Sequence, residues 1–295
     1  METNRKILKV GIVLIAVLVV IGYVGVYLLR LDEPVVIEHY IEEQTYFAYQ
    51  QSPRKINVEL YYIANSTDDR VVSRIDFPEH PDLQVPASEF GMHGQFAVFT
   101  DGQQQTPGNI EGRYSIRTVY LEFAFDEDYQ EGESIEITEA EIHLSDGSVF
   151  TAEIGSINFH FEEEHSNTIE FLSSSGSNYQ TVTEFIVEEE IELVGIESEF
   201  LTLIQENLEM RVNGKNFQEI QGMIIEAGEK ISIESNIKSS EIVGEKFRYL
   251  QLRPKIRFIK ENGEEETAPT IAGWYHRQEY DFYEIFQYLQ LKGAL

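Results

Sequence analysis

The chain has 295 residues, and its 52 Asp and Glu against 22 Lys and Arg give it a net charge of −30. A surface this acidic repels phosphate groups, which excludes nucleic acid as a partner. The lack of cysteine excludes disulfides and thiol chemistry, and a content of 42% hydrophobic and 12% aromatic residues excludes a disordered chain.

The first predicted element is a membrane helix at residues 10–29. These twenty residues contain no charge and no proline, and as a helix they are about 30 Å long, the thickness of the hydrocarbon core of a bilayer. A cleaved secretory signal has a shorter apolar region of about 7–15 residues, followed by small residues at the cleavage site. Here Arg30 follows the run, so we expect an uncleaved anchor. The alternatives are a buried core helix and a signal that is cleaved late.

The charges around this run predict its orientation. Arg5, Lys6 and Lys9 precede it, and positive charge marks the cytoplasmic side of a membrane helix. We therefore expect a type II membrane protein with a cytoplasmic tail at residues 1–9 and the rest of the chain outside the cell. The tail is too short to fold, so any signal across the membrane needs a protein partner there or in the envelope. An exported chain without cysteine is typical of a Gram-positive bacterium.

The exterior part is more acidic than the whole chain. Beyond residue 30 there are 18 Lys and Arg against 51 Asp and Glu, a net charge of −33. Such a surface is repelled by anionic lipid headgroups and attracts cations or a basic partner. Solubility alone is the preferred interpretation of this charge, and attraction of a cation or a basic partner is the alternative.

The first half of the exterior has the alternating pattern of strands. Residues 30–53 are expected to form a juxtamembrane stalk or a first strand. Residues 54–162 then contain six or seven short segments of alternating apolar and polar residues, typical of a β-sandwich. Asp146-Gly147 lies between two such segments and predicts a hairpin. The loop-dense stretch 78–113 is where a binding surface is expected first.

A polar charge run at residues 162–167 is the predicted domain boundary. The strand pattern resumes after it, which predicts a second sandwich within 167–295, and Asn262-Gly263 predicts another tight turn. The stretch 199–210 is expected to contain one or two helical turns. The predicted fold is thus mainly β, with an N-terminal transmembrane helix and two Ig-like β-sandwich domains.

A short C-terminal helix is predicted over residues 282–291. Phe282, Phe286 and Leu289 fall on one helical face, and Asp281 with Glu284 forms a capping-box pattern at its start. We expect this helix to pack across an open end of the second sandwich, with docking of a partner on its aromatic face as the alternative.

Two short motifs are candidates for catalysis or metal binding. Ser235 and Lys238 fit S-x-x-K, but in a strand their side chains face opposite sides, so lysine cannot activate serine. His160 and His165 are the only close histidine pair in the sequence, and they point to different sides of a strand; an exposed loop is the preferred interpretation over a metal site.

Acidic residues suggest two further sites. Asp126 and Asp128 resemble the start of a calcium loop, but glycine comes one position late and Ile137 occupies position twelve, so an acidic turn is preferred. Carboxylate pairs for glycoside hydrolysis cannot be chosen among so many acids without the fold. The sequence therefore names no catalytic residue and no cofactor, and it leaves a metal site open.

The predicted function is a non-enzymatic binding or scaffold role at the cell surface, carried by a membrane-anchored β-rich protein. Two alternatives remain open. One is a cell-envelope hydrolase that uses a carboxylate pair in a deep cleft, and the other is a calcium-dependent adhesion module.

Overall fold

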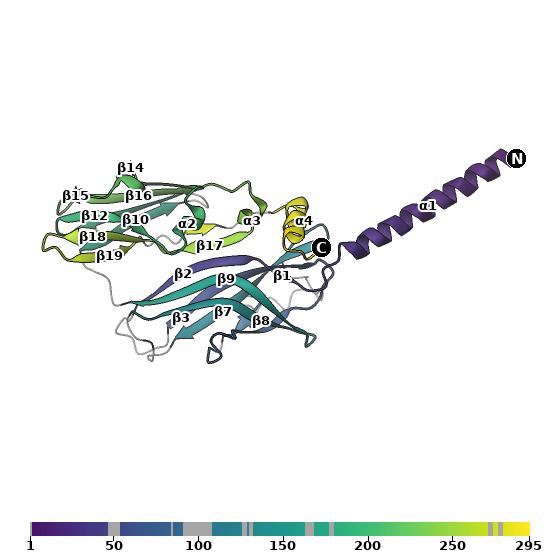
Figure 1. The fold of residues 1–295 in the computed structure, drawn as a ribbon, viewed down its shortest axis with the longest axis horizontal. Helices are drawn as coiled ribbons and strands as arrows, with labels where there is room; N and C mark the ends of the chain where they lie inside the picture. The colour runs from purple at the N-terminus through teal and green to yellow at the C-terminus, as the bar shows by residue number, and fades with distance from the viewer. Residues whose placement is uncertain are drawn as a thin grey trace.

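The fold is mainly β, as the sequence predicts, with its strands arranged in four sheets (Figure 1). The computed structural model describes residues 2–46, 54–83, 85–90, 108–125, 129, 132–162, 168–176, 180–270, 274–276 and 280–295. All statements below concern these residues.

The N-terminal helix α1 (Glu2–Leu28) leaves the β body as a single projecting rod (Figure 1). Its large apolar side chains that are described, from Ile12 to Leu28, are 48 to 76% exposed. These side chains face outward because an uncharged run without polar positions offers no amphipathic face. The body contacts the helix near its end, where Arg113 Nη1 donates to the carbonyl of Gly25 at 3.5 Å. A helix over most of residues 10–29 forms as expected. Among the described residues, however, no helix has an apolar segment long enough to span a membrane.

The end of α1 is fixed directly to the β body. Leu31 is 2% exposed, and its backbone N–H donates to Asn65 Oδ1 at 3.0 Å. In return, Asn65 Nδ2 donates to the carbonyl of Leu31 at 2.8 Å. The Tyr114 hydroxyl donates to the carbonyl of Leu29 at 2.9 Å. The body is therefore hydrogen-bonded to the chain directly at the helix end. Within the expected stalk or first strand at residues 30–53, the described part contains strands at Val35–Val36 and Glu38–Tyr46, and residues 47–53 lie outside the described residues.

The first hydrophobic core lies between two sheets, and alternating apolar residues on long strands supply most of it. Sheet I consists of β1 (Val35–Val36), β3 (Arg54–Asn65), β7 (Tyr114–Phe125) and β5 (Ala87–Ser88), with β6 (Asn109–Glu111) also paired to β7. Sheet II consists, in spatial order, of β20 (Trp274–His276), β17 (Arg248–Leu252), β2 (Glu38–Tyr46), β9 (Val149–Glu162), β8 (Ser134–Leu144) and β4 (Val72–Asp76). The predicted hairpin at Asp146-Gly147 is confirmed: it joins β8 to β9, and Gly147 has φ +86°.

The second core lies between the two remaining sheets. Sheet III consists of β10 (Ile169–Gly176), β11 (Gln180–Val187), β16 (Lys230–Ile237), β13 (Leu208–Val212) and β14 (Lys215–Asn216). Sheet IV consists of β15 (Met223–Ile225), β12 (Ile191–Glu197), β18 (Lys255–Lys260) and β19 (Glu265–Pro269). Helix α2 (Leu201–Ile204), a 3₁₀ turn at Phe217–Glu219 and helix α3 (Val243–Lys246) lie in the connections. The turn at Asn262-Gly263 joins β18 to β19 as expected, with Gly263 at φ +83°.

Sheet II connects the two halves of the chain. Strand β2 lies between β9 and β17 and runs parallel to both. On β17, Tyr249 belongs to the first core whereas Leu250 belongs to the second, so this part of the sheet is covered on both faces. The predicted boundary at residues 162–167 lies almost entirely outside the described residues, and the division into two Ig-like domains stays a prediction.

The close approach of β2 to β9 requires a glycine. Gly155 has φ +94°, and a Cβ there would lie 2.1 Å from the carbonyl oxygen of His39. No side chain fits this space, and only glycine adopts this φ without strain.

The C-terminal helix α4 (Phe282–Leu291) has the predicted bounds. Its capping box is confirmed, with the Asp281 side chain accepting from the Glu284 backbone N–H at 2.9 Å. Its position differs from the expectation: Ile285, Tyr288 and Leu289 are buried in the first core and not in the second. The reason is Phe247, which stacks on Tyr288 at 4.2 Å between ring centroids and directs the helix to that side.

Candidate functional site

Of the two candidate motifs of the sequence, only Ser235 and Lys238 lie wholly within the described residues, and they do not come together. Ser235 is buried on β16, whereas Lys238 is exposed and pairs with Glu209 at 2.5 Å, so the two face opposite sides. His160 Nε2 lies 3.4 Å from Glu199 Oε1, a contact with one carboxylate. His165, and the calcium-like acids Asp126 and Asp128, lie outside the described residues.

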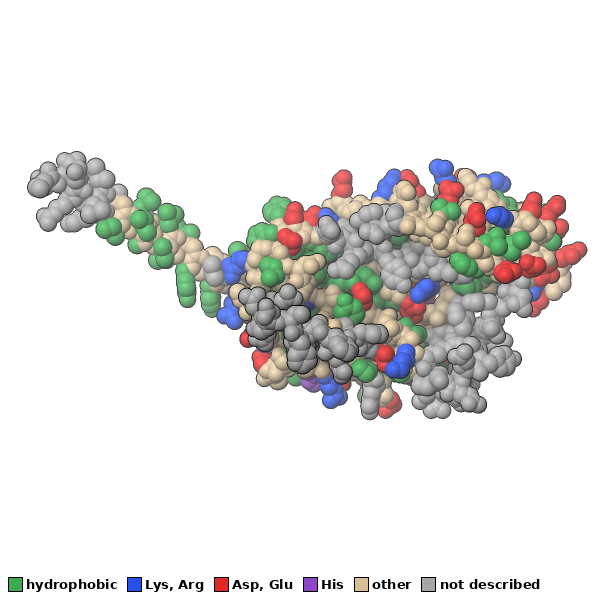
Figure 2. Space-filling view, turned by 180° about the vertical axis from the view of Figure 1, so that it is seen from behind, with side chains coloured by type: hydrophobic (Ala, Val, Ile, Leu, Met, Phe, Trp, Pro, Cys, Tyr) green, Lys and Arg blue, Asp and Glu red, His purple; other side chains and the backbone are tan. Residues whose placement is uncertain are grey.

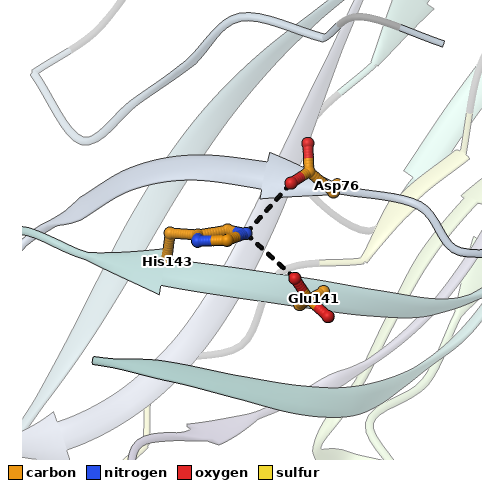
Figure 3. A group of neighbouring side chains, drawn as sticks. All are labelled: Asp76, Glu141 and His143. Carbon is orange, nitrogen blue, oxygen red and sulfur yellow. Dashed lines mark ion pairs between the residues drawn. The ribbon is translucent and has the colours of Figure 1, made fainter. Parts of the chain in front are cut away.

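The fold instead brings together Asp76, Glu141 and His143 (Figure 3). Strand β4 is the edge strand of sheet II and pairs antiparallel with β8, and in this register Asp76 lies opposite Glu141 while Arg74 lies opposite His143. Because side chains two residues apart share one face of a strand, all four point to the outer face of the sheet.

His143 is held between two carboxylates. Its Nε2 lies 2.9 Å from Asp76 Oδ2 and 3.2 Å from Glu141 Oε1. The other oxygen of Asp76, Oδ1, accepts from Arg74 Nε at 2.7 Å. The ligand-type atoms of the three side chains all lie within 4.8 Å of one another. An imidazole nitrogen and two carboxylate oxygens at this spacing can share a proton or hold a metal ion.

No local pattern in the sequence points to this cluster. Asp76 and Glu141 are 65 positions apart, and only the β4–β8 register makes them neighbours. The one feature visible in the sequence was that Glu141 and His143 are two residues apart, so that on a strand their side chains share one face. This spacing is too common to identify a site.

A second polar cluster is buried around Arg117 on β7 and Glu89, the residue after β5. Arg117 is fully buried, and its guanidinium donates to the carbonyls of Asp68 and, at 2.6 Å, of Arg70. Glu89 accepts from the Tyr62 hydroxyl and, at 2.5 Å, from the Val72 backbone N–H.

Burial raises the pKa of the Glu89 carboxyl above its ordinary range, and burial likewise raises the pKa of Tyr62. Every polar group in this cluster, the second carboxylate oxygen of Glu89 excepted, has a hydrogen-bond partner among the described residues, so its role is to fix the start of β4 and the segment before it to sheet I. Half of the stretch 78–113, where a binding surface is expected, lies outside the described residues, namely residues 84 and 91–107.

A third cluster joins the two halves of the molecule. Glu42 on β2 is 3% exposed and accepts from the Ser198 hydroxyl at 2.6 Å. Burial raises the pKa of the Glu42 carboxyl. Beside it, Glu43 accepts from the Gln251 side chain and from Arg253 Nη2 at 3.3 Å. These hydrogen bonds tie β2 to the start and end of the second half and stabilise their relative position.

A small cavity lies where α2, α3, β16 and β17 meet. Its lining residues are Leu203, Ile204, Asn207, Ile237, Lys238, Ser240, Glu245, Arg248 and Leu250, and its volume is about 20 Å³. This is room for about one water molecule, and Glu245 is the single carboxylate in the lining. The cavity therefore cannot accommodate a sugar ring between two acids.

The comparisons with known proteins add no family. No protein-family model and no curated protein matches the chain. Among solved structures, the sialic acid-binding region of a Streptococcus sanguinis SK1 adhesin aligns with 81% of this chain and 76% of its own length, at 7% identity and a TM-score of 0.26.

Two further solved structures align over a similar part of this chain. The D00-D0 domain of intimin aligns with 83% of this chain and 100% of its own length, at 7% identity and a TM-score of 0.25. A putative carbohydrate-binding protein from Bacteroides ovatus aligns with 81% and 68%, at 11% identity and a TM-score of 0.25. Similarity at these TM-scores carries no argument about function.

Proposed function

We propose that this chain is a membrane-anchored, extracytoplasmic binding or scaffold protein without enzymatic activity, with its N-terminus in the cytoplasm. The observation that carries the proposal is the exposed helix α1. A helix with apolar side chains on all sides is stable only where something apolar surrounds it, and the body buries its own apolar residues in two cores. The uncharged run 10–29 and the basic residues before it favour a bilayer as that surrounding.

The contacts at the base of α1 support a rigid presentation of the body. The Leu31–Asn65 pair and the Tyr114 hydroxyl join the helix to β3 and β7 without a linker. Helices α3 and α4 lie at the same end of the body (Figure 1). Their exposed apolar residues Ile242, Tyr283 and Leu291, each more than 60% exposed, fit an end that faces the membrane interface.

The opposite end of the body is acidic. Figure 2 shows acidic side chains gathered on the part of the body far from α1. Three turns there carry exposed glutamates: Glu188, Glu189, Glu190, Glu226, Glu229, Glu261 and Glu264. The β11–β12 and β15–β16 turns are hydrogen-bonded to each other through the carbonyl of Val187 and the N–H of Gly228 at 2.6 Å. We call these residues the acidic tip; its charge favours a basic partner outside the cell.

The two-domain Ig-like organisation is part of this proposal. Sheets that enclose one core each, joined by a shared strand, suit a scaffold that holds its ends at a fixed distance. Exposed strand edges and end loops are the usual binding surfaces of such folds.

The cysteine-free sequence makes topology testable with single cysteines. A membrane-impermeant maleimide added to intact cells is expected to label Ile224→Cys in the body, and to label Thr3→Cys only after lysis. The opposite labelling pattern contradicts the orientation. Recovery of the protein from the culture fluid without its first thirty or so residues contradicts the anchor.

Partner binding is tested separately, by cross-linking from Ile224→Cys, next to the acidic tip, in native membranes. A cross-linked partner is expected to be lost when Glu188, Glu189 and Glu190 are changed to Gln, and kept when the exposed Glu153 is changed to Gln instead. An adduct that survives loss of the tip charges contradicts the basic-partner proposal.

A further inference from the structure

We propose that Asp76, Glu141 and His143 form a binding site for one Zn²⁺ ion, with a coordination position left open to the outside. The inference goes beyond the proposed function, since it assigns a ligand to a surface that the scaffold role does not use. It rests on the arrangement of the three side chains in Figure 3.

Strand pairing places the three groups before any ion binds. Glu141 and His143 lie on the same face of β8, and Asp76 faces Glu141 from β4. The β-bulge between Val72 and Arg74 gives β4 an extra residue, Ser73, whose hydroxyl donates to the His143 carbonyl at 3.1 Å. Ligands on two paired strands with a fixed register are better preorganised than ligands on loops.

The surroundings of His143 Nε2 favour a bound cation. This atom is shielded from solvent and makes no hydrogen bond of acceptable geometry with any described residue, yet carboxylate oxygens lie 2.9 Å and 3.2 Å away. Neither oxygen therefore lies along the direction of the ring nitrogen's lone pair, and in Figure 3 they approach from opposite sides. Two anions beside a nitrogen lone pair repel it unless a proton or a metal ion lies between them.

The distances suit a metal ion. Zn²⁺ takes imidazole nitrogen and carboxylate oxygen at about 2.0–2.2 Å in tetrahedral geometry, which separates neighbouring ligand atoms by about 3.3–3.4 Å. The two observed nitrogen–oxygen separations, 2.9 and 3.2 Å, are within a few tenths of an ångström of the lower end of this range, and the two carboxylate oxygens lie within 4.8 Å of each other. In a tetrahedral zinc site the metal ion lies along the lone-pair direction of the imidazole nitrogen, so the oxygen ligands lie to the side of that direction, as they do here.

The donor set selects the kind of ion. Ca²⁺ and Mg²⁺ prefer six or more oxygen ligands, whereas an imidazole nitrogen favours zinc and its first-row neighbours. Two carboxylates and one neutral imidazole also balance the two charges of the ion. Arg74 holds Asp76 Oδ1 at 2.7 Å, so Oδ2 remains directed at the site, as outer-shell partners of metal ligands do.

Three protein ligands leave a fourth position. The side chains of His143, Asp76 and Glu141 are 27, 34 and 44% exposed, and β4 is an edge strand. The fourth ligand is therefore water or a donor atom from another molecule at the cell surface, which would let the ion bridge this body to a partner.

The test is a zinc titration of the full-length chain in detergent, after treatment with a chelator, against a chromophoric zinc competitor. We expect one equivalent of Zn²⁺ to be held, and Co²⁺ in its place to give the visible absorption of a low-coordinate site. His143→Gln, and separately Glu141→Gln, should weaken binding at least tenfold. His160→Gln is the matched control, a histidine beside one carboxylate, and should bind as the wild type does.

Several outcomes overturn the proposal. One is that the wild type binds no Zn²⁺ tightly, and another is that His143→Gln binds Zn²⁺ as well as the wild type does. A third is that millimolar Ca²⁺ displaces the Zn²⁺, which would show non-specific cation binding to surface carboxylates. Circular dichroism of each variant shows whether it is folded. If His143→Gln does not fold, Glu141→Gln, which keeps the imidazole, decides between the two results.

Discussion

The junction between α1 and the β body gives the sharpest prediction about stability. Asn65 is 9% exposed and satisfies both backbone groups of Leu31, which is itself 2% exposed. Asn65→Ala leaves a buried N–H and a buried C=O without partners and with little access to water. Each such group costs about 1–3 kcal/mol, so for the two groups we expect a loss of about 2–6 kcal/mol in the free energy of unfolding.

Urea unfolding of the full-length chain in detergent, followed by circular dichroism, measures this loss. Asn57→Ala is the matched control, because Asn57 lies on the same strand β3 with an exposed side chain, and such changes stay within about 0.5 kcal/mol. A nitroxide at Tyr27→Cys should become more mobile in Asn65→Ala, since the helix end is released. If both the unfolding curve and the label are unchanged, Asn65 does not fix the junction.

Three further predictions concern buried groups. Burial lowers the pKa of His39 to about 3, so as the pH falls below about 6.5 the histidine takes up a proton in the unfolded chain before it does so in the folded one. The free energy of unfolding of the wild type should therefore fall by roughly 2 kcal/mol between pH 6.5 and 5, and His39→Gln should lack this pH dependence. Gly155→Ala should lower the free energy of unfolding by more than about 3 kcal/mol, because the new Cβ would lie 2.1 Å from the carbonyl oxygen of His39. Gly147→Ala is the control: Gly147 has φ +86° but open space around it, so the loss should be only about 1–2 kcal/mol. Arg117→Ala should cost about 3–5 kcal/mol because it leaves buried carbonyls unpaired, against about 1 kcal/mol or less for Lys55→Ala at an exposed ion pair.

Urea unfolding at pH 5, 6 and 7 measures all three. Equal pH slopes for the wild type and His39→Gln would mean that the histidine is not held neutral by burial. Equal losses at Gly155 and Gly147 would mean that β2 does not approach β9 this closely. A mild effect of Arg117→Ala would mean that water replaces the guanidinium and that the cluster is open to solvent.

Local patterns in the sequence were sufficient for the individual elements. The α4 helix has the predicted bounds because its capping box and apolar spacing act within one or two turns. The β8–β9 hairpin forms at Asp146-Gly147 because glycine there adopts φ +86° without strain. The mainly β class follows from the same short-range alternation along the strands.

The candidate site formed by Asp76, Glu141 and His143 could not be predicted from the sequence. Asp76 meets His143 only through the β4–β8 register, and a shift of one residue would turn Asp76 to the opposite face. For the same reason only close neighbours such as His160 and His165 could be considered from the sequence, and these are interpreted as part of an exposed loop.

The amino-acid order alone thus determined the exposed apolar helix, the strand rhythm, the turns and the charge, since each depends on neighbours a few positions away. Tertiary structure decided that β2 lies between β9 and β17, that α4 covers the first core, and that Asp76 meets Glu141 and His143. These three arrangements depend on strand pairings between segments far apart in the chain. Such pairings are selected because they bury whole sheet faces, and no local sequence pattern in a single segment predicts them.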